Sequence, residues 1–207
     1  MKVVLINASP RNSSSSASLL ESLKRYLDGQ IETVELHCSK KVVSEDDLKQ
    51  LRDADRWVIA CPLYVDGIPG HFLSCMKQIA DEVKSTPHVY GIINCGFYEG
   101  IQTDLALEIL ENWCCKSDYS WGGGVGVGGG GALASLPKLE PGVGPKAPVD
   151  KALKNLAETV LKNIPQKNEF VSLAFPRFLY KLAAQWGWRG AIKTNGGCAK
   201  DLNKRLS

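Results

Sequence analysis

The sequence predicts an α/β fold in which an open parallel sheet of five strands, in the order 2-1-3-4-5, carries helices on both faces. Strand-like runs alternate with helix-like runs five times along the 207 residues, and this alternation is typical of parallel sheets. The first, third and fourth strand-like runs are almost continuously apolar, as in strands buried on both faces. The second and fifth contain more polar residues or glycine, which indicates edge positions and gives the order.

Local signals place each element along the chain. The strands are expected at residues 3–6, 31–36, 57–61, 89–94 and 118–127. Apolar residues at spacings of three and four indicate the helices between them. The first of these begins on a cluster of serines and stops at Asp28-Gly29, and the second begins at Ser44 with three acidic residues in its first turn. Further helices are expected over the apolar runs that begin at Phe72, at Leu105 and, after Pro148, at Leu153.

A serine-rich loop, NASPRNSSSS at residues 7–16, joins the first strand to the first helix. A helix start presents unpaired backbone N–H groups and a partial positive charge, so it suits an anion. Arg11 adds a planar cation, and the loop contains no Asp or Glu. Serines also make ordinary helix caps, but a cap needs only one. We therefore predict a phosphate-binding loop that uses Ser9, Arg11, Ser13, Ser14, Ser15 and Ser16.

The surroundings of this loop favour a bound cofactor over a phosphorylated substrate. The loop does not match the G-x-x-x-x-G-K-[ST] pattern of nucleoside triphosphatases. None of the seven cysteines has an arginine six places later, as a cysteine phosphatase requires. The phosphate therefore has no evident nucleophile to attack it.

Two more loops are expected beside the phosphate loop, because a sheet of this order changes direction between strands 1 and 3 and binds ligands beyond the carboxyl ends there. They are CPLYVDG at residues 61–67 and NCGFYEG at 94–100. The three loops form a slot with one polar end and one flat apolar end, which is the shape of FMN. Tyr64 and Phe97 are expected to cover the ring faces, with ordinary packing between loop and helix as the alternative. Backbone N–H groups of Val65, Asp66 and Gly96 are expected at the polar edge of the ring.

Composition limits the class of protein. A chain that is 44% hydrophobic with a net charge of +3 suits one domain with a full core, and it contains no apolar stretch of the ~20 residues that span a membrane. The start lacks a signal-peptide pattern. Seven cysteines without C-x-x-C spacing argue against a disulfide framework or a metal site. We expect a reduced, cytoplasmic protein without a metal ion.

The last part of the chain differs in charge from the rest. Residues 176–207 contain seven basic residues and one acidic residue, interleaved with aromatic side chains. We divide the chain into a cofactor-binding domain at 1–165 and an extension at 166–207 that packs on the domain or on a partner subunit. Four roles of the extension are possible: a lid over the cofactor, a site for the NADPH phosphate, a dimer contact, or docking on an anionic membrane surface. We prefer the dimer contact or the lid. Nucleic acid is not an expected partner of the chain.

The glycine run that starts at Gly124 satisfies G-x-G-x-x-G. The dinucleotide fingerprint needs a helix directly after it, whereas residues 133–145 contain Pro137 and Pro141 and no helical pattern. We interpret the glycines as a strand end and a loop, beside the cofactor or a partner subunit.

On these motifs the chain resembles the NADPH-dependent FMN reductase-like oxidoreductases of the flavodoxin fold. The segments that carry the resemblance are INASPRNSSSS at 6–16, CPLYVDGIPGHF at 61–72 and NCGFYEG at 94–100, with PRFLYKLAAQWGW at 176–188 and TNGGCAKDL at 194–202 in the tail. The resemblance implies that the serines and Arg11 hold the FMN phosphate, and that Glu99 lies near the ring. It implies that ribityl and isoalloxazine are held by Pro62, Leu63, Tyr64, Val65, Asp66, Asn94, Cys95, Gly96 and Phe97.

The function expected from these features is that of an FMN-dependent NAD(P)H oxidoreductase. Hydride passes from NAD(P)H to N5 of bound FMN, and a quinone, flavin, azo or nitro compound then takes both electrons. No side chain is expected to act as an essential acid or base, although Asp66 is placed to tune the flavin. The alternative is a flavodoxin-like electron carrier without a substrate of its own. A homodimer or higher oligomer is expected.

Overall fold

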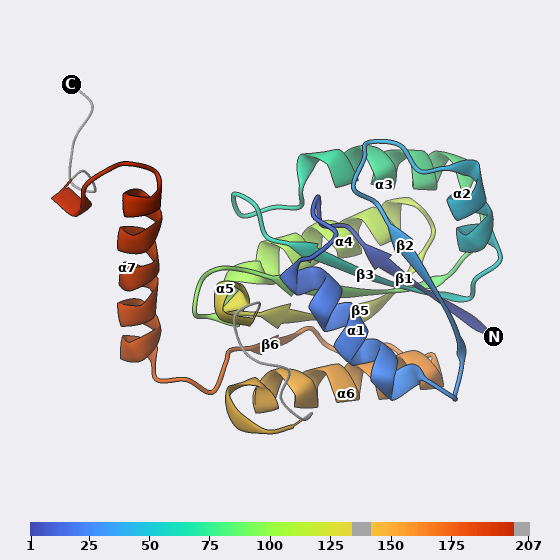
Figure 1. The fold of residues 1–207 in the computed structure, drawn as a ribbon. Coiled ribbons are helices and arrows are strands. Elements are labelled where there is room, and N and C mark those ends of the chain that lie inside the picture. The colour runs from blue at the N-terminus through green and yellow to red at the C-terminus, as the bar shows by residue number, and fades with distance from the viewer. Residues whose placement is uncertain (134–141, 201–207) are drawn as a thin grey trace. The chain divides into compact units, whose positions relative to one another are not determined.

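The computed structural model describes residues 1–133 and 142–200, and the chain divides into two compact units, Met1–Leu173 and Ala174–Ser207. The first unit contains an all-parallel sheet of six strands in the order β2-β1-β3-β4-β5-β6 (Figure 1). The strands are β1 (Lys2–Asn7), β2 (Glu32–His37), β3 (Arg56–Pro62), β4 (His88–Asn94), β5 (Ser120–Val127) and β6 (Glu169–Val171).

Helices cover both faces of this sheet (Figure 1). One face carries α1 and α6, which also pack against each other, and the other face carries α2, α3 and α4. The long helices of the first unit are α1 (Ser15–Leu27), α2 (Glu45–Arg52), α3 (Gly70–Glu82), α4 (Asp104–Lys116) and α6 (Ala147–Lys162). Short helical turns are η1 (Gly100–Thr103), α5 (Gly130–Leu133) and η2 (Gly144–Lys146). The α/β class with helices on both faces is as predicted.

The larger core lies between the sheet and helices α2, α3 and α4. Trp57 of β3 is fully buried there, and its ring meets that of Tyr119 edge-on with the ring centroids 5.0 Å apart. Trp113 of α4 contacts the same tyrosine in the same way at 5.2 Å. The Tyr119 hydroxyl donates to the carbonyl of Val83, the C-cap of α3, at 2.7 Å, and the carbonyl of Ile79 lies 3.2 Å away, so its polar atom is satisfied inside the core. This cluster fixes α3 and α4 against the central strands that carry the site.

The prediction of five strands with the fifth at the edge is wrong, because β6 pairs with β5 on its outer side. β5 is rich in glycine because its neighbours approach it closely, and not because it is exposed. A Cβ on Gly122 would lie 2.3 Å from the ring of Tyr90, and one on Gly126 would lie 2.1 Å from the hydroxyl of Thr103. The first unit therefore runs to Leu173, past the predicted boundary at residue 165.

The second unit contains α7 (Arg177–Thr194). Four basic residues and no acidic residue occur in this helix, and Phe178, Trp186 and Trp188 are exposed on it. Across the described ranges 1–133 and 142–200, no helix combines the length and apolar character that a membrane crossing requires. Packing of this extension on the domain or on a partner subunit stays a prediction.

Candidate functional site

The loops that follow the central strands meet at one edge of the sheet. The N–H of Ala8, just after β1, donates to the carbonyl of Ala60 in β3 at 2.8 Å. The N–H of Leu63, just after β3, donates to the carbonyl of Asn94 at the end of β4 at 2.8 Å. Because the strands are parallel and in register, their carboxyl ends lie together. The structure thus brings the three predicted loops side by side.

Hydrogen bonds within the serine-rich loop shape it into a tight turn. The Ser9 N–H donates to the side-chain oxygen of Asn7 at 3.1 Å, and the Ser9 hydroxyl accepts from the N–H of Arg11 at 3.2 Å. Ser9 is buried, and its carbonyl also accepts from the ring nitrogen Nε2 of His37 at 2.9 Å. Ser14 is the N-cap of α1, because its hydroxyl accepts from the N–H of Ala17. These contacts hold the loop in place from both sides.

Two of the serines connect the loop to the rest of the site through their hydroxyls. Ser16 is fully buried, and its hydroxyl donates to the side-chain oxygen of Asn94 at 2.7 Å. Ser15 donates to the carbonyl of Gly130, which follows β5, at 2.7 Å. These hydroxyls are engaged with the protein, so any bond from Ser15 or Ser16 to a ligand would come from the backbone N–H.

The backbone of residues 12–16 presents a row of donors. Within the described part of the chain, the N–H groups of these five residues have no acceptor. Arg11 and Ser13 are exposed beside them, and no described carboxylate pairs with Arg11. The loop itself contains no acidic residue. This arrangement of N–H groups at the start of α1, together with one unpaired guanidinium, suits a phosphate group.

The loop after β3 makes a hairpin-like turn with unusual backbone angles. Tyr64 and Gly67 exchange two hydrogen bonds, of 2.9 and 3.0 Å, around Val65 and Asp66. Both central residues have positive φ, 48° at Val65 and 57° at Asp66. For a β-branched residue this left-handed conformation is strained, and the Val65 side chain is fully exposed, so packing does not explain it. Val65 and Asp66 are therefore held in a strained turn shortly after β3.

Replacing Val65 by Asn is expected to stabilise the protein by about 1 kcal/mol, because Asn tolerates the left-handed region and valine does not. The free energy of unfolding from urea denaturation measures this. Val42→Asn is the matched control, since Val42 is also exposed and has no positive φ. Equal effects of the two substitutions would mean that the turn at Val65 is not strained.

The loop after β4 is held by the glycines that follow β5. The N–H of Gly129 donates to the carbonyl of Phe97 at 2.6 Å, and that of Gly130 donates to the carbonyl of Cys95 at 2.7 Å. Burial raises the pKa of the Cys95 thiol, so this cysteine is neutral. Phe97 stays half exposed on the loop, as Tyr64 does on its own. Residues 128–130 therefore lie directly against the loop after β4. Whether these glycines face a cofactor or a partner subunit stays a prediction.

The described part of the glycine run contains no extended dinucleotide-binding helix. The turn α5 follows the glycine run and ends at Leu133. We expected no helix in the proline-containing stretch, but most of that stretch, residues 134–141, lies outside the described residues. The glycines are explained instead by neighbouring backbone that lies too close for a side chain. A Cβ on Gly128 would lie 2.1 Å from the carbonyl oxygen of Tyr98.

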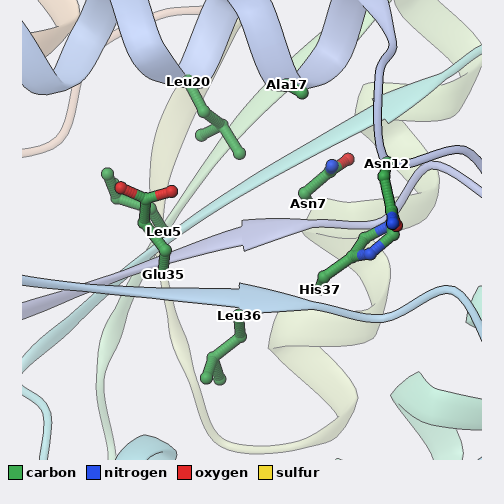
Figure 2. A pocket seen from close by; sticks show the side chains of 8 residues that line it. All are labelled: Leu5, Asn7, Asn12, Ala17, Leu20, Glu35, Leu36 and His37. Atoms are coloured by element: carbon green, nitrogen blue, oxygen red, sulfur yellow. The ribbon is translucent and has the colours of Figure 1, made fainter.

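A cleft of about 240 Å³ opens between α1 and β2, next to the serine-rich loop (Figure 2). Asn7, Asn12 and His37 lie together at one end of it, whereas Glu35 and leucine side chains lie at the other (Figure 2). Its full lining is Leu5, Asn7, Asn12, Ala17, Leu20, Glu35, Leu36 and His37. The sequence did not indicate this cleft, because its walls come from three elements whose residues show no shared motif. Among the described residues, no group of three or more His, Cys, Asp or Glu side chains could hold a metal ion.

Comparisons with known proteins identify the fold. A family profile described as a flavodoxin-like fold matches residues 1–101. A search of curated protein sequences gave no significant match. The profile match and the structural matches that follow show a flavodoxin-like fold.

Solved structures match over most of the chain at low sequence identity. An NADH:FMN oxidoreductase (EMOB), in its apo form, is 15% identical with a TM-score of 0.59, over 80% of this chain and 90% of its own. An oxidoreductase from Corynebacterium diphtheriae is 14% identical with a TM-score of 0.59, over 79% and 96%. RosB, solved with 8-demethyl-8-formylriboflavin-5'-phosphate, is 14% identical with a TM-score of 0.57, over 79% of both chains.

Proposed function

We propose that this flavodoxin-fold chain is an FMN-dependent oxidoreductase that uses NAD(P)H to reduce a small acceptor such as a quinone, flavin, azo or nitro compound. The row of unpaired N–H groups at residues 12–16, beside the unpaired cation of Arg11, carries the proposal. Two of the structural matches support it, since one is named an NADH:FMN oxidoreductase and another was solved with a riboflavin 5'-phosphate derivative.

The residues at the loops fit FMN. Backbone donors of residues 12–16 and the Arg11 guanidinium would hold the phosphate, because they offer several charge-assisted hydrogen bonds and no repelling carboxylate. Residues 62–66 and 94–97, with Glu99 nearby, would hold the ribityl chain and the ring. Tyr64 and Phe97 have exposed rings that can lie against a flat ligand.

FMN, when bound, supplies a site that accepts a hydride and passes two electrons on. The protein supplies position and electrostatics. Backbone N–H groups at the strained turn of Val65 and Asp66 would orient the polar edge of the ring, and the carboxylate of Asp66 would adjust the charge near it. The bond between Ser16 and Asn94 keeps the phosphate loop and the β4 loop at a fixed separation.

The competing function is that of a flavodoxin-like electron carrier, which binds FMN but has no substrate of its own. The two differ in turnover. Purified protein loaded with FMN is expected to oxidise NADPH steadily when menadione is the acceptor, at a rate proportional to protein concentration and above that of free FMN. Retention of FMN with no turnover above the free-flavin rate would favour the carrier.

Further expectations accompany this proposal. The chain is proposed to act as a homodimer or higher oligomer in the cytoplasm, with the 174–200 segment as a dimer contact or a lid. NAD(P)H is its proposed co-substrate. Size-exclusion chromatography with light scattering would test the oligomer, and a monomer at micromolar concentration would contradict it.

A further inference from the structure

Charge is divided between the loops that meet at the proposed site. The loop after β1 contains Arg11 and no acidic residue. The loops after β3 and β4 have the opposite sign, because they contain Asp66 and Glu99, and Asp104 begins α4 a few residues later. No Lys or Arg occurs in these two loops or in the first two turns of the helices α3 and α4. This edge of the sheet is therefore basic at the phosphate loop and acidic at the loops proposed to hold the flavin ring.

Backbone contacts bring the two acidic loops together. The bond from the N–H of Leu63 to the carbonyl of Asn94 joins the loop after β3 to the end of β4. The turn that follows Leu63 also lies close to α4, since a Cβ on Gly67 would be 3.9 Å from the side chain of Ile109. Asp66 is exposed in this turn. The turn that carries Asp66 is therefore held against both the end of β4 and helix α4.

The acidic side chains keep their charge available to a ligand. Among the described residues, no Lys or Arg forms an ion pair with Asp66 or Asp104. The rings of Tyr64 and Phe97, in the same two loops, are 46% and 54% exposed. Aromatic faces bind flat apolar groups and also attract cations. The carboxylates and the exposed rings thus both favour an aromatic compound that is neutral or positively charged.

We propose that the ring end of this site selects electron acceptors by their charge, so that neutral and cationic aromatic compounds are reduced in preference to anionic ones such as sulfonated azo dyes. Asp66 is the main specificity-determining residue, because its carboxylate is exposed and unpaired within the loop after β3. This inference rests on the proposed function and narrows the class of acceptor within it.

An ionic acceptor responds to this charge as it approaches the site. An acidic surface attracts a cation and repels an anion, which changes the rate of association. Dissolved salt screens the effect, since the Debye length falls from about 30 Å at 0.01 M to about 10 Å at 0.1 M. The direction of the salt dependence therefore reports the sign of the charge that the acceptor meets, whatever the intrinsic reactivity of the acceptor.

The test isolates reduction of the acceptor from binding of NAD(P)H, which is itself an anion. Full-length protein loaded with FMN is photoreduced without oxygen and mixed in a stopped-flow instrument with 1,4-naphthoquinones that carry a propyl chain ending in trimethylammonium, hydroxyl or sulfonate. Each quinone takes up two electrons from the reduced cofactor and two protons in total, and becomes a hydroquinone. The propyl chain separates the charged group from the ring, so the quinones have similar intrinsic reactivity.

At an ionic strength of about 0.01 M, we expect the second-order rate constant to be about tenfold larger for the cationic quinone than for the anionic one, with the neutral quinone between them. Raising the ionic strength to about 1 M is expected to slow the cation, to accelerate the anion and to bring the two within about twofold of each other.

Two matched variants locate the effect. Asp66→Asn removes the charge but keeps a side chain that tolerates positive φ, and it is expected to reduce the ratio of the cation rate to the anion rate to about threefold. A change in flavin potential would alter the rates of all the quinones together and leave this ratio as it is. Asp118→Asn is the control, because Asp118 is also exposed, has a φ of 59° and precedes β5 at the opposite edge of the sheet.

The outcomes separate this inference from the proposed function. Equal rate constants for the cationic and anionic quinones at low salt, or a faster reaction of the anion, would overturn the charge selection and leave the proposed oxidoreductase intact. An equal loss of the ratio in Asp118→Asn would also overturn it, because the net charge of the protein would then be responsible instead of the ring end of the site. Failure of the protein to retain FMN would contradict the proposed function, and the charge selection with it.

Discussion

Riboflavin is expected to bind this protein at least about a thousandfold more weakly than FMN. The two ligands differ only in the phosphate, which the backbone N–H groups of residues 12–16 and the guanidinium of Arg11 would hold. Hydrogen bonds to a charged group contribute roughly 1.5–3 kcal/mol each, so three of them at the lower value already correspond to about a thousandfold in affinity. Isothermal titration of the apoprotein with each ligand measures the ratio.

Substitution of Arg11 separates the contribution of its guanidinium to FMN affinity from that of the backbone N–H groups. Arg11→Ala is expected to weaken FMN binding by about tenfold and to leave riboflavin binding unchanged. Arg25→Ala is the matched control, because Arg25 carries the same charge but lies in the last turn of α1, at the opposite end from the loop, and pairs with Glu21 on the surface. Equal affinities for FMN and riboflavin in the wild-type protein would contradict the phosphate role of the loop, and the proposed function with it.

The central part of the fold could be predicted because strands that are buried on both faces consist of continuous apolar residues. Runs such as residues 57–61 have no polar residue, which is typical of a strand covered on both faces, and β3 is buried along this run. β6 has three residues, lies half-buried at the edge and shows no apolar run, so pattern alone could not find it. The sequence indicated β6 only indirectly, through the glycines of β5, which mark places where another segment comes too close for a side chain.

The candidate site was predictable as a set of loops, but not as a set of contacts. Strand order alone places the loops after β1, β3 and β4 at one edge. Whether a serine hydroxyl faces a ligand or another part of the protein depends on partners that are distant in sequence. Ser16 bonds to Asn94, seventy-eight residues away, and Ser15 bonds to Gly130.

Gly100→Ala is expected to destabilise the protein by about 3 kcal/mol or more, because the close approach at this position involves backbone on both sides. An added Cβ would lie 2.3 Å from the carbonyl oxygen of Val171 in β6 and 2.7 Å from that of Gly126 in β5. Neither atom can move aside as a flexible side chain would, so the 3-10 turn η1 or strand β6 must shift. Gly100 also donates its N–H to the hydroxyl of Ser172 at 3.2 Å, a bond that the same shift would break.

Urea denaturation monitored by circular dichroism measures this loss, with Gly70→Ala as the control. Gly70 begins α3, has no positive φ, and has no atom within 4 Å of the position of an added Cβ. Alanine there is expected to be neutral or to stabilise by up to about 1 kcal/mol. Because η1 directly follows the loop that holds Phe97 and Glu99, the Gly100 variant is also expected to bind FMN more weakly. A variant as stable as wild type would mean that β6 does not pack against η1, and that the loop after β4 has no support from this edge of the sheet.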